Sequence, residues 1–246
     1  SGHGCKWPAA RAPIALSYPR VSIVVPVLND AQALAHLLAE LESFPAEPFP
    51  AEAFEVIVAD GGSTDDSRSL AVNAGCILVT SPPGRGLQLA TGADRARGAL
   101  IWLLHADTRG VADSLQWLLS RNAEPCWGRF NVTLADASPV LRLVAFMMNL
   151  RSRATGICTG DQGIFVHRRL LTACGGIPEQ PLMEDIELCR RLKRLAPPEC
   201  QRQLLTTSSR RWRQQGVVRT ILRMWQLRAR YWMGADPGVL AREYYR

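Results

Sequence analysis

The sequence predicts an α/β fold with a mixed, mainly parallel central sheet flanked by helices. Three observations carry this prediction. Short apolar runs alternate with amphipathic segments through the first half of the chain, Gly and Pro separate them, and several runs end directly in acidic residues. Alternating strands and helices predict parallel pairing with right-handed crossovers. The 246 residues are enough to bury a full core.

The elements of the first half follow from hydrophobic periodicity. We expect buried strands at residues 21–28, 54–60, 76–80 and 99–104. We expect helices at about 31–41, from near Thr64, and from the Pro82–Gly86 loop to about Arg97. Each helix would then carry the chain back to begin the next parallel strand.

Beyond Asp107 the pattern becomes mixed. Residues 126–134 alternate like a half-exposed strand, with Phe130 and Val132 opposed to Arg129 and Asn131. We expect a helix at about 139–151, a strand at 163–167, and helices at 184–195 and 217–233. The last of these helices is basic and amphipathic.

The charge of the chain favours anionic partners. The formal net charge is +7, and every basic side chain except Lys6 and Lys193 is Arg, which suits bidentate phosphate binding. No nucleic-acid-binding motif is present, so we expect no nucleic-acid partner. Arginines and aromatic residues gather after Arg190, which suits an anionic membrane surface, although a helix packed on the core predicts the same periodicity.

Cysteine usage and hydropathy indicate a compartment. Seven cysteines without a CxxC pair argue against a disulfide framework and a zinc site, and they suit a reducing environment. The sequence contains no uninterrupted apolar run of about 18 residues, the length that a membrane-spanning helix needs. We therefore expect a cytoplasmic protein, peripheral at the inner face of the membrane if its basic C-terminal helix binds lipid.

Acidic residues follow three of the predicted strands. Asp30, Asp60 and Asp107 each come after an apolar run, and His105 lies two residues before Asp107. The carboxyl ends of parallel strands meet at one sheet edge, where open α/β folds bind ligands. The alternative is that these carboxylates cap turns and helices, which explains residues 63–66 well. His105 is as readily an oriented structural residue as a ligand contact.

Three further motifs carry candidate chemistry. Arg85, between two glycines at a helix start, is a candidate diphosphate contact, although a Gly-flanked Arg is common in surface loops. Asp185 begins a helix, where the dipole favours any acidic residue, and the functional interpretation makes it a general base. Arg211 beside Trp212 can grip a phosphate, or lie on a solvated basic face. Asp107 is the candidate ligand of a hard divalent cation, Mn²⁺ or Mg²⁺.

Taken in order, six segments resemble the inverting family 2 glycosyltransferases, which have the Rossmann-like glycosyltransferase A fold. Within them, the chain is most similar to the small soluble radical-SAM/selenodomain-associated transferases. The resemblance covers about residues 21–212. The segments are VSIVVPVLND, EVIVADGGSTDDS, GRG, the HAD at 105–107, GDQGIFVHR and MEDIELCRRL.

The resemblance implies a role for each matching position. Asp107 would bind the metal, and Asp185, with Glu184 beside it, would be catalytic. The nucleotide-binding residues would be Pro26, Asn29, Asp30, Asp60, Arg85, His105, Ala106 and Arg211. Three positions depart from the family pattern: Gly61 replaces a frequent Asp, His105 replaces the first Asp of D-x-D, and Ser208 replaces the Gln of the processive Q-x-x-R-W signature.

The implied activity is metal-dependent, inverting transfer of a sugar from a UDP-linked donor to a hydroxyl acceptor, which is a small molecule, a glycan or a lipid-linked group. With Ser208 in place of Gln, we expect one transfer per acceptor. A nucleotidyltransferase, or a non-catalytic nucleotide-sugar or membrane-surface binding module, is the alternative. We expect an N-terminal extension at 1–20 and a single domain at 21–246. This domain comprises a nucleotide-sugar half (21–108), an acceptor half (109–215) and a basic amphipathic C-terminal helix (216–246).

Overall fold

A seven-stranded sheet forms the centre of the protein, in the order β3-β2-β1-β4-β6-β5-β7. The computed structural model describes residues 19–45, 48–50, 53–121, 124–136 and 138–244. The strands are β1 (Val21–Val27), β2 (Phe54–Asp60), β3 (Ile77–Thr80), β4 (Leu100–Leu103), β5 (Trp127–Leu134), β6 (Phe165–His167) and β7 (Glu199–Thr207). Only β6 runs against its neighbours within this sheet, which confirms the predicted mixed, mainly parallel arrangement.

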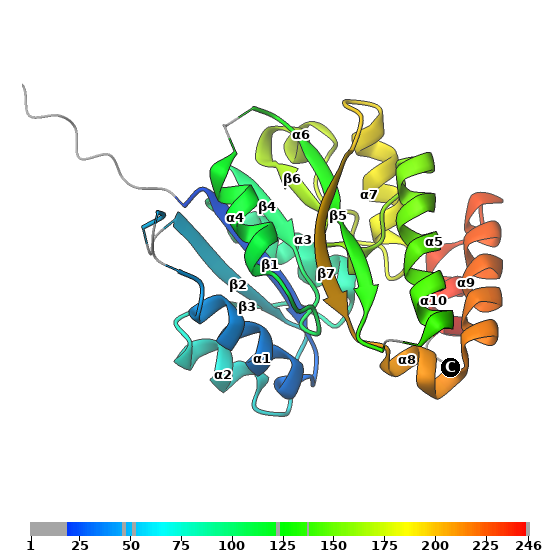
Figure 1. Cartoon of the computed structure of the whole chain (residues 1–246), viewed down its shortest axis with the longest axis horizontal. Coiled ribbons are helices and arrows are strands. Elements are labelled where there is room, and N and C mark those ends of the chain that lie inside the picture. The colour runs from blue at the N-terminus through cyan, green and yellow to red at the C-terminus, as the bar shows by residue number, and fades with distance from the viewer. Residues whose placement is uncertain (1–18, 46–47, 51–52, 122–123, 137, 245–246) are drawn as a thin grey trace, which may run out of the picture.

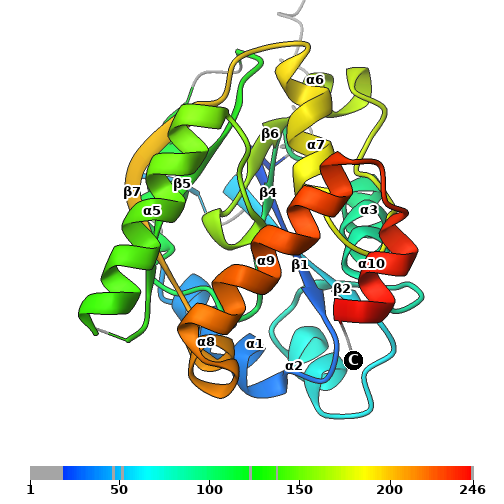
Figure 2. The same ribbon diagram turned by 90° about the vertical axis from the view of Figure 1, so that its right-hand side faces the viewer.

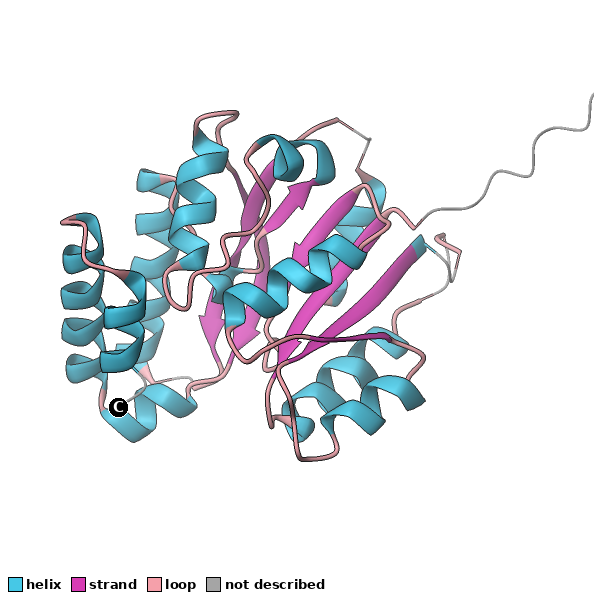
Figure 3. Ribbon diagram, turned by 180° about the vertical axis from the view of Figure 1, so that it is seen from behind, coloured by secondary structure: helices cyan, strands magenta, loops and turns pink. Residues whose placement is uncertain are grey.

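Helices cover both faces of the sheet (Figure 1 and Figure 3). The helices are α1 (Ala31–Glu42), α2 (Ser67–Asn73), α3 (Arg85–Arg95), α4 (Ala112–Ser120), α5 (Pro139–Thr155), α6 (Arg168–Ala173), α7 (Glu184–Lys193), α8 (Arg210–Gln215), α9 (Val217–Trp232) and α10 (Pro237–Tyr244), with a 3₁₀ turn, η2 (Gly160–Gln162). Sequence reasoning did not identify α4, α6, α8, α10 or β7.

Two cores lie on opposite faces of the sheet because side chains alternate along each strand. In β1, Ile23 and Val25 pack in one core with α1 and α4, whereas Val24 packs in the other with α3. The second core continues over α6 and α7 and reaches Leu227 of α9. Burial on both faces explains why β1 is an unbroken apolar run.

The expectation of a half-exposed strand at 126–134 is wrong for the first part of β5. Trp127 and Arg129 are both fully buried. β5 lies inside the sheet between β6 and β7, and both of its faces are covered there. The Arg129 guanidinium donates to the side chain of Asn131 and, at 2.9 Å, to the carbonyl of Asn149 in α5. These acceptors satisfy the two terminal nitrogens of the buried cation, whereas its Nε has no partner among the described residues.

The C-terminal segment forms two helices where sequence reasoning expected one. Gly234, with a positive φ of 90°, follows α9, and Pro237 begins α10. Proline suits the first turn of a helix because its missing N–H would have no partner there. Figure 2 shows α9 passing between α5 and α10. In the part of the chain that the structure describes, no helix is long and apolar enough to cross a membrane.

A polar network closes the amino edge of the sheet, away from the strand ends described below. The carboxylate of Glu55 in β2 accepts hydrogen bonds from Ser22 Oγ and the Arg97 backbone N–H, each at 2.6 Å. Ser22 Oγ in turn accepts from the Gly98 N–H at 2.8 Å. Burial raises the pKa of Glu55, but the hydrogen bonds from Ser22 and Arg97 and the Arg97 charge lower it by more.

The variant Glu55→Gln is therefore expected to lose about 1–3 kcal/mol of unfolding free energy at neutral pH, since hydrogen bonds to a charged group are lost. A carboxyl with a lowered pKa stabilises the fold above its unfolded pKa, about 4.3, and loses this effect as the pH falls through the folded pKa. Urea unfolding at several pH values measures the difference. If the difference in unfolding free energy between the wild-type protein and Glu55→Gln stayed constant down to pH 3, this would contradict the role given to the Glu55 network.

Candidate active site

The polar loops predicted from the sequence meet at one edge of the sheet. β1 pairs in parallel with both β2 and β4, with Val27 opposite Asp60 and Val24 opposite Leu103. The residues that follow these three strands therefore leave the sheet side by side. This places Asp30, Asp60 and the His105–Asp107 segment along the carboxyl edge, where ligands bind in open α/β sheets.

The loops after β1 and β2 are tied to each other. The Asn29 side chain accepts a hydrogen bond from the Thr64 N–H at 2.8 Å, and the Asn29 N–H donates to Ser63 Oγ at 2.9 Å. Asp60 is buried, and its carboxylate accepts from the backbone N–H groups of Gly62 and Ser63, each at 3.1 Å. Asp60 thus closes the turn after β2, which agrees with the alternative that these carboxylates cap turns and helices. Both loops nevertheless lie at the carboxyl edge of the sheet.

Arg85, whose side chain is 32% exposed, forms an ion pair with the buried Glu184 across two elements. Arg85 begins α3, Glu184 begins α7, and the Arg85 Nε donates to Glu184 Oε1. Glu184 is only 2% exposed, and its other oxygen has no hydrogen-bond partner. Burial alone lowers the pKa of Arg85, but Glu184, and then Asp185 and Asp161, raise it above its usual value. Arg85 therefore balances several negative charges.

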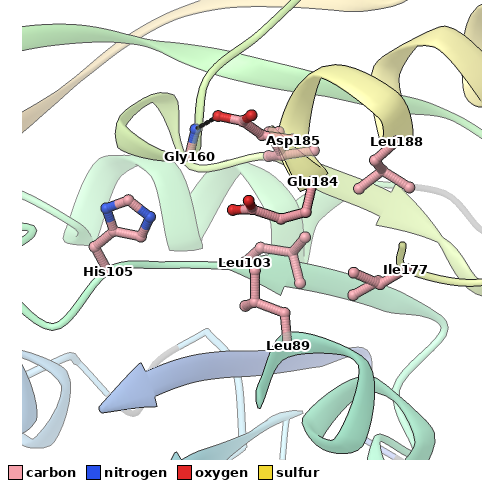
Figure 4. Close-up of a pocket in the computed structure, with 9 residues that line it drawn as sticks. Leu89, Leu103, His105, Gly160, Ile177, Glu184, Asp185 and Leu188 are labelled. Atoms are coloured by element: carbon pink, nitrogen blue, oxygen red, sulfur yellow. Dashed lines mark hydrogen bonds between the residues drawn. The ribbon is translucent and has the colours of Figure 1, made fainter. Parts of the chain in front are cut away.

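The backbone of Gly160 lies between His105 and Asp185 (Figure 4). The Gly160 N–H donates to Asp185 Oδ2 at 3.0 Å. A Cβ on residue 160 would lie 2.5 Å from His105 Nε2, so only glycine allows this approach. His105 Nδ1 lies 3.3 Å from Asp161, and its Nε2 is buried without a hydrogen-bond partner. β4, η2 and α7 thus meet at one point.

A cavity of about 840 Å³ opens beside this junction. At one end it is polar, lined by Arg85, His105, Asp107, Asp161 and Asp185. The rest of its wall comes mostly from α5, α8 and α9 and is largely apolar. The arrangement can bind a charged, metal-chelating group beside a carboxylate and hold a second group against the apolar wall.

The structure brings together some of the predicted residues and separates others. Arg85, His105, Asp107 and Asp185 line the cavity, whereas Glu184 lines a small pocket next to it. Pro26, Asn29, Asp30, Asp60 and Ala106 are at the same sheet edge but outside the lining. Arg211 lies in α8, and its side chain is outside the described part of the chain.

Sequence reasoning missed several residues of the cavity. Arg210, the neighbour of the predicted Arg211, lines it and lies 3.4 Å from Asp30. Asp161 also lines the cavity; it lies in the matching segment GDQGIFVHR, in which sequence reasoning gave no role to this carboxylate. Arg151 and Arg228 come from α5 and α9, which are far apart in sequence. The available signal was positional for two of them, because Arg151 and Arg228 each continue an apolar stripe on their helix.

Parts of the chain are similar to known proteins. Residues 22–122 match the profile of glycosyl transferase family 2. An undecaprenyl-phosphate 4-deoxy-4-formamido-L-arabinose transferase of Pseudomonas paraeruginosa is 30% identical over 154 residues, covering 58% of this chain and 44% of the relative. The same-named protein of Klebsiella pneumoniae is 27% identical over 161 residues, covering 60% and 49%. The chain thus spans about half the length of these curated relatives.

Two solved structures show the same fold. A mannosyltransferase from Pyrobaculum calidifontis in complex with GDP-Man and Mn²⁺ has a TM-score of 0.56 at 22% identity, covering 82% of this chain and 60% of that chain. Glucosyl-3-phosphoglycerate synthase from Mycobacterium tuberculosis, with Mn²⁺, UDP and glucosyl-3-phosphoglycerate, has a TM-score of 0.51 at 20% identity, covering 85% and 77%. The predicted glycosyltransferase A fold is confirmed.

The close approach at Gly160 yields a prediction. Gly160→Ala is expected to cost about 1–3 kcal/mol of unfolding free energy, because the new methyl group overpacks against His105. In a His105→Ala background the same substitution should cost much less, since the ring is gone. Thermal or urea unfolding of the four proteins in this double-mutant cycle measures the coupling. An equal loss in both backgrounds would show that the contact with His105 carries no strain.

Proposed function

We propose that this chain, whose residues 22–122 match the profile of glycosyl transferase family 2, is a metal-dependent, inverting glycosyltransferase. It transfers one sugar from a UDP-linked donor to a hydroxyl acceptor. The observation that supports this most is the placement of Asp107 and Asp185 in the lining of one cavity at the carboxyl edge of the sheet. The Asp107 carboxylate is then available to bind a cation, and the Asp185 carboxylate is available to accept a proton.

The donor is assigned to the edge formed by β1, β2 and β4. Asp30 and Asp60, at the ends of β1 and β2, are proposed to contact the nucleoside, with Pro26, Asn29 and Ala106 beside them. Arg85 and Arg211 are assigned to the diphosphate, because guanidinium groups match phosphate oxygens. UDP is favoured by the complex of the Mycobacterium tuberculosis enzyme; GDP, held by the Pyrobaculum calidifontis enzyme, is the other candidate.

A divalent cation fits the polar end of the cavity. Asp107 offers carboxylate oxygens there, and the Nε2 of His105 is buried without a partner. Among the described residues, no cluster of three or more Asp, Glu, His or Cys side chains would hold an ion alone. This suits Mg²⁺ or Mn²⁺, which protein carboxylates often bind jointly with substrate phosphates. When bound, the cation neutralises charge on the departing diphosphate.

Asp185 is assigned as the general base. The acceptor hydroxyl oxygen attacks the anomeric carbon, the bond from this carbon to the diphosphate oxygen breaks, and the hydroxyl proton passes to Asp185. The Gly160 N–H holds Asp185 Oδ2, so the carboxylate is oriented before the acceptor arrives. Glu184, buried against Arg85, is better placed to position this region than to accept the proton.

The test is transfer and donor binding by variants of the two carboxylates. Asp185→Asn is expected to lower transfer at least about a hundredfold, since general bases contribute 10²–10⁴-fold, while UDP binding in Mn²⁺ stays near the wild-type level. Asp107→Asn should instead weaken UDP binding in Mn²⁺ and leave the weaker binding in EDTA unchanged. Calorimetry with UDP and a radiolabelled-donor assay separate the two effects.

The same assay separates the rival activities. A glycosyltransferase releases a nucleoside diphosphate from the donor, whereas a nucleotidyltransferase releases pyrophosphate. Donor turnover that Asp185→Asn leaves unchanged would remove Asp185 from the mechanism. UDP-sugar binding without any turnover in Mn²⁺ or Mg²⁺ would favour a non-catalytic binding module.

We also propose that the protein associates peripherally with an anionic membrane at the cytoplasmic face. Val218 and Leu222 of α9 are exposed among arginines, and Trp232 and Met233 at its end are exposed as well. All six described cysteines are free, which suits a reducing compartment. Sedimentation with phosphatidylglycerol vesicles at low salt, but not with phosphatidylcholine vesicles, is expected. Equal recovery with both vesicles, or with neither, would contradict this assignment.

A further inference from the structure

Two helices present matching stripes to the cavity. In each, three apolar residues at spacing i, i+3 and i+4 are followed by an arginine at i+7, so that all four share one helix face. On α5 the stripe is Val144, Met147, Met148 and Arg151; on α9 it is Ile221, Met224, Trp225 and Arg228. All eight residues line the cavity beside the candidate active site. The cavity therefore has two apolar walls, each continued by a cation.

The two arginines lack full partners among the described residues. Nη2 of Arg151 and Nε of Arg228 are both buried without a hydrogen-bond acceptor. Neither guanidinium forms an ion pair with a described residue; Arg151 donates only to the Ile157 carbonyl, at 3.3 Å. Burial, and then the positive charge of Arg228, lower the pKa of Arg151 to about 10. Buried donor nitrogens without an acceptor are costly, and an anion bound by both guanidinium groups would supply the acceptor.

The arginines also lie near the reacting end of the cavity. Asp185 acts electrostatically on Arg151, and both residues line the same space. An anionic group held by Arg151 and Arg228 would therefore lie close to the proposed base. Arg85, another cation at this end, is paired with Glu184 and assigned above to the donor diphosphate. The donor diphosphate is assigned to the sheet edge, so the arginine pair is available to a second ligand.

The apolar walls are poorly covered by the protein itself. Met147 is 51% exposed and Trp225 64%, and Val140 and Leu143 extend the stripe of α5 outward with more than half of their surface exposed. Exposed apolar surface of this extent marks a binding site when polar groups border it. A chain of methylene groups that left water for these walls would gain free energy in proportion to its buried area.

We propose that this cavity is the acceptor site and that the acceptor is a lipid phosphate: an amphiphile whose phosphate lies on Arg151 and Arg228 and whose apolar tail lies between α5 and α9. The assignment rests on the function proposed above and names its acceptor class. The reacting oxygen belongs to a head-group hydroxyl, on the phosphate itself or on a group attached to it, and its proton passes to Asp185 when the donor bond breaks. Figure 2 shows the end of the molecule at which both helices lie.

Binding of a soluble analogue tests the site without donor or metal. In calorimetry with the full chain, dodecyl phosphate below its micelle concentration is expected to bind at least tenfold more tightly than hexyl phosphate. Each fully buried methylene contributes up to about fourfold in affinity. Inorganic phosphate and the neutral amphiphile dodecyl maltoside should each bind at least tenfold more weakly than dodecyl phosphate.

Matched variants on the same helices locate the phosphate. Arg151→Gln and Arg228→Gln are each expected to weaken dodecyl phosphate binding at least tenfold. Arg142→Gln on α5 and Arg219→Gln on α9, whose side chains are exposed and outside the cavity lining, should change it less than twofold. Trp225→Ser should weaken dodecyl phosphate more than hexyl phosphate. Thermal unfolding confirms that each variant is folded, and the chain-length comparison needs no variant.

The outcomes separate this proposal from the proposed function. Equal binding of dodecyl phosphate and dodecyl maltoside, no dependence on chain length, or wild-type affinity in both arginine variants would overturn the lipid phosphate site. Donor-dependent transfer to glycerol phosphate as fast as to a polyprenyl phosphate would overturn the role of the tail. If dodecyl phosphate binds as expected but no lipid phosphate receives sugar, the site stands and the transferase assignment fails. Asp185→Asn should lose transfer and keep dodecyl phosphate binding.

Discussion

The approach of the Gly160 backbone to His105 and Asp185 is the constraint on which the site depends. Its physical origin is the antiparallel insertion of β6 between β4 and β5. Because β6 begins opposite the end of β4, the η2 turn that precedes it returns to the carboxyl edge of the sheet. There the Gly160 N–H reaches the Asp185 carboxylate at 3.0 Å, and the missing side chain leaves room for the His105 ring.

The ion pair between Arg85 and Glu184 extends this constraint to α3. Removing the Glu184 carboxylate from water costs several kcal/mol, so its ion pair with Arg85 contributes little net stability. Its value lies in geometry, because it joins the start of α3 to the start of α7. Glu184 is then engaged with a cation, whereas the neighbouring Asp185 faces the cavity. Adjacent residues on one helix thus take different roles.

The cavity combines a charged floor with apolar walls that the fold leaves open. A globular helix normally buries its apolar stripe against the core. α9 buries only Thr220 and Leu227, and much of the apolar surface of α5 is exposed as well. The buried, unpartnered nitrogens of Arg151 and Arg228 lie in the same cavity. Uncovered apolar surface and unsatisfied donors in one place are explained together by a single amphiphilic ligand.

The sequence by itself determined the α/β class, the mainly parallel arrangement of the sheet and the sheet edge at which the candidate residues gather. These follow from short-range patterns: the apolar runs of β1, β2 and β4, and the polar residues directly after them. The roles assigned to Asp60, Asp107 and Asp185 stay predictions, although Asp107 and Asp185 do share one cavity.

Only the tertiary structure decided the burial of Arg129 and the placement of Arg151 and Arg228 in one cavity. Both depend on contacts between distant segments: Arg129 and Asn149 are 20 residues apart in the chain, and α5 and α9 are further apart still. Helical and strand periodicity states which face of one element is apolar, but not which partner covers it. An arginine can lie in water, inside a sheet or beside another arginine. Packing between distant segments decides which of these occurs, and local sequence patterns do not encode that packing.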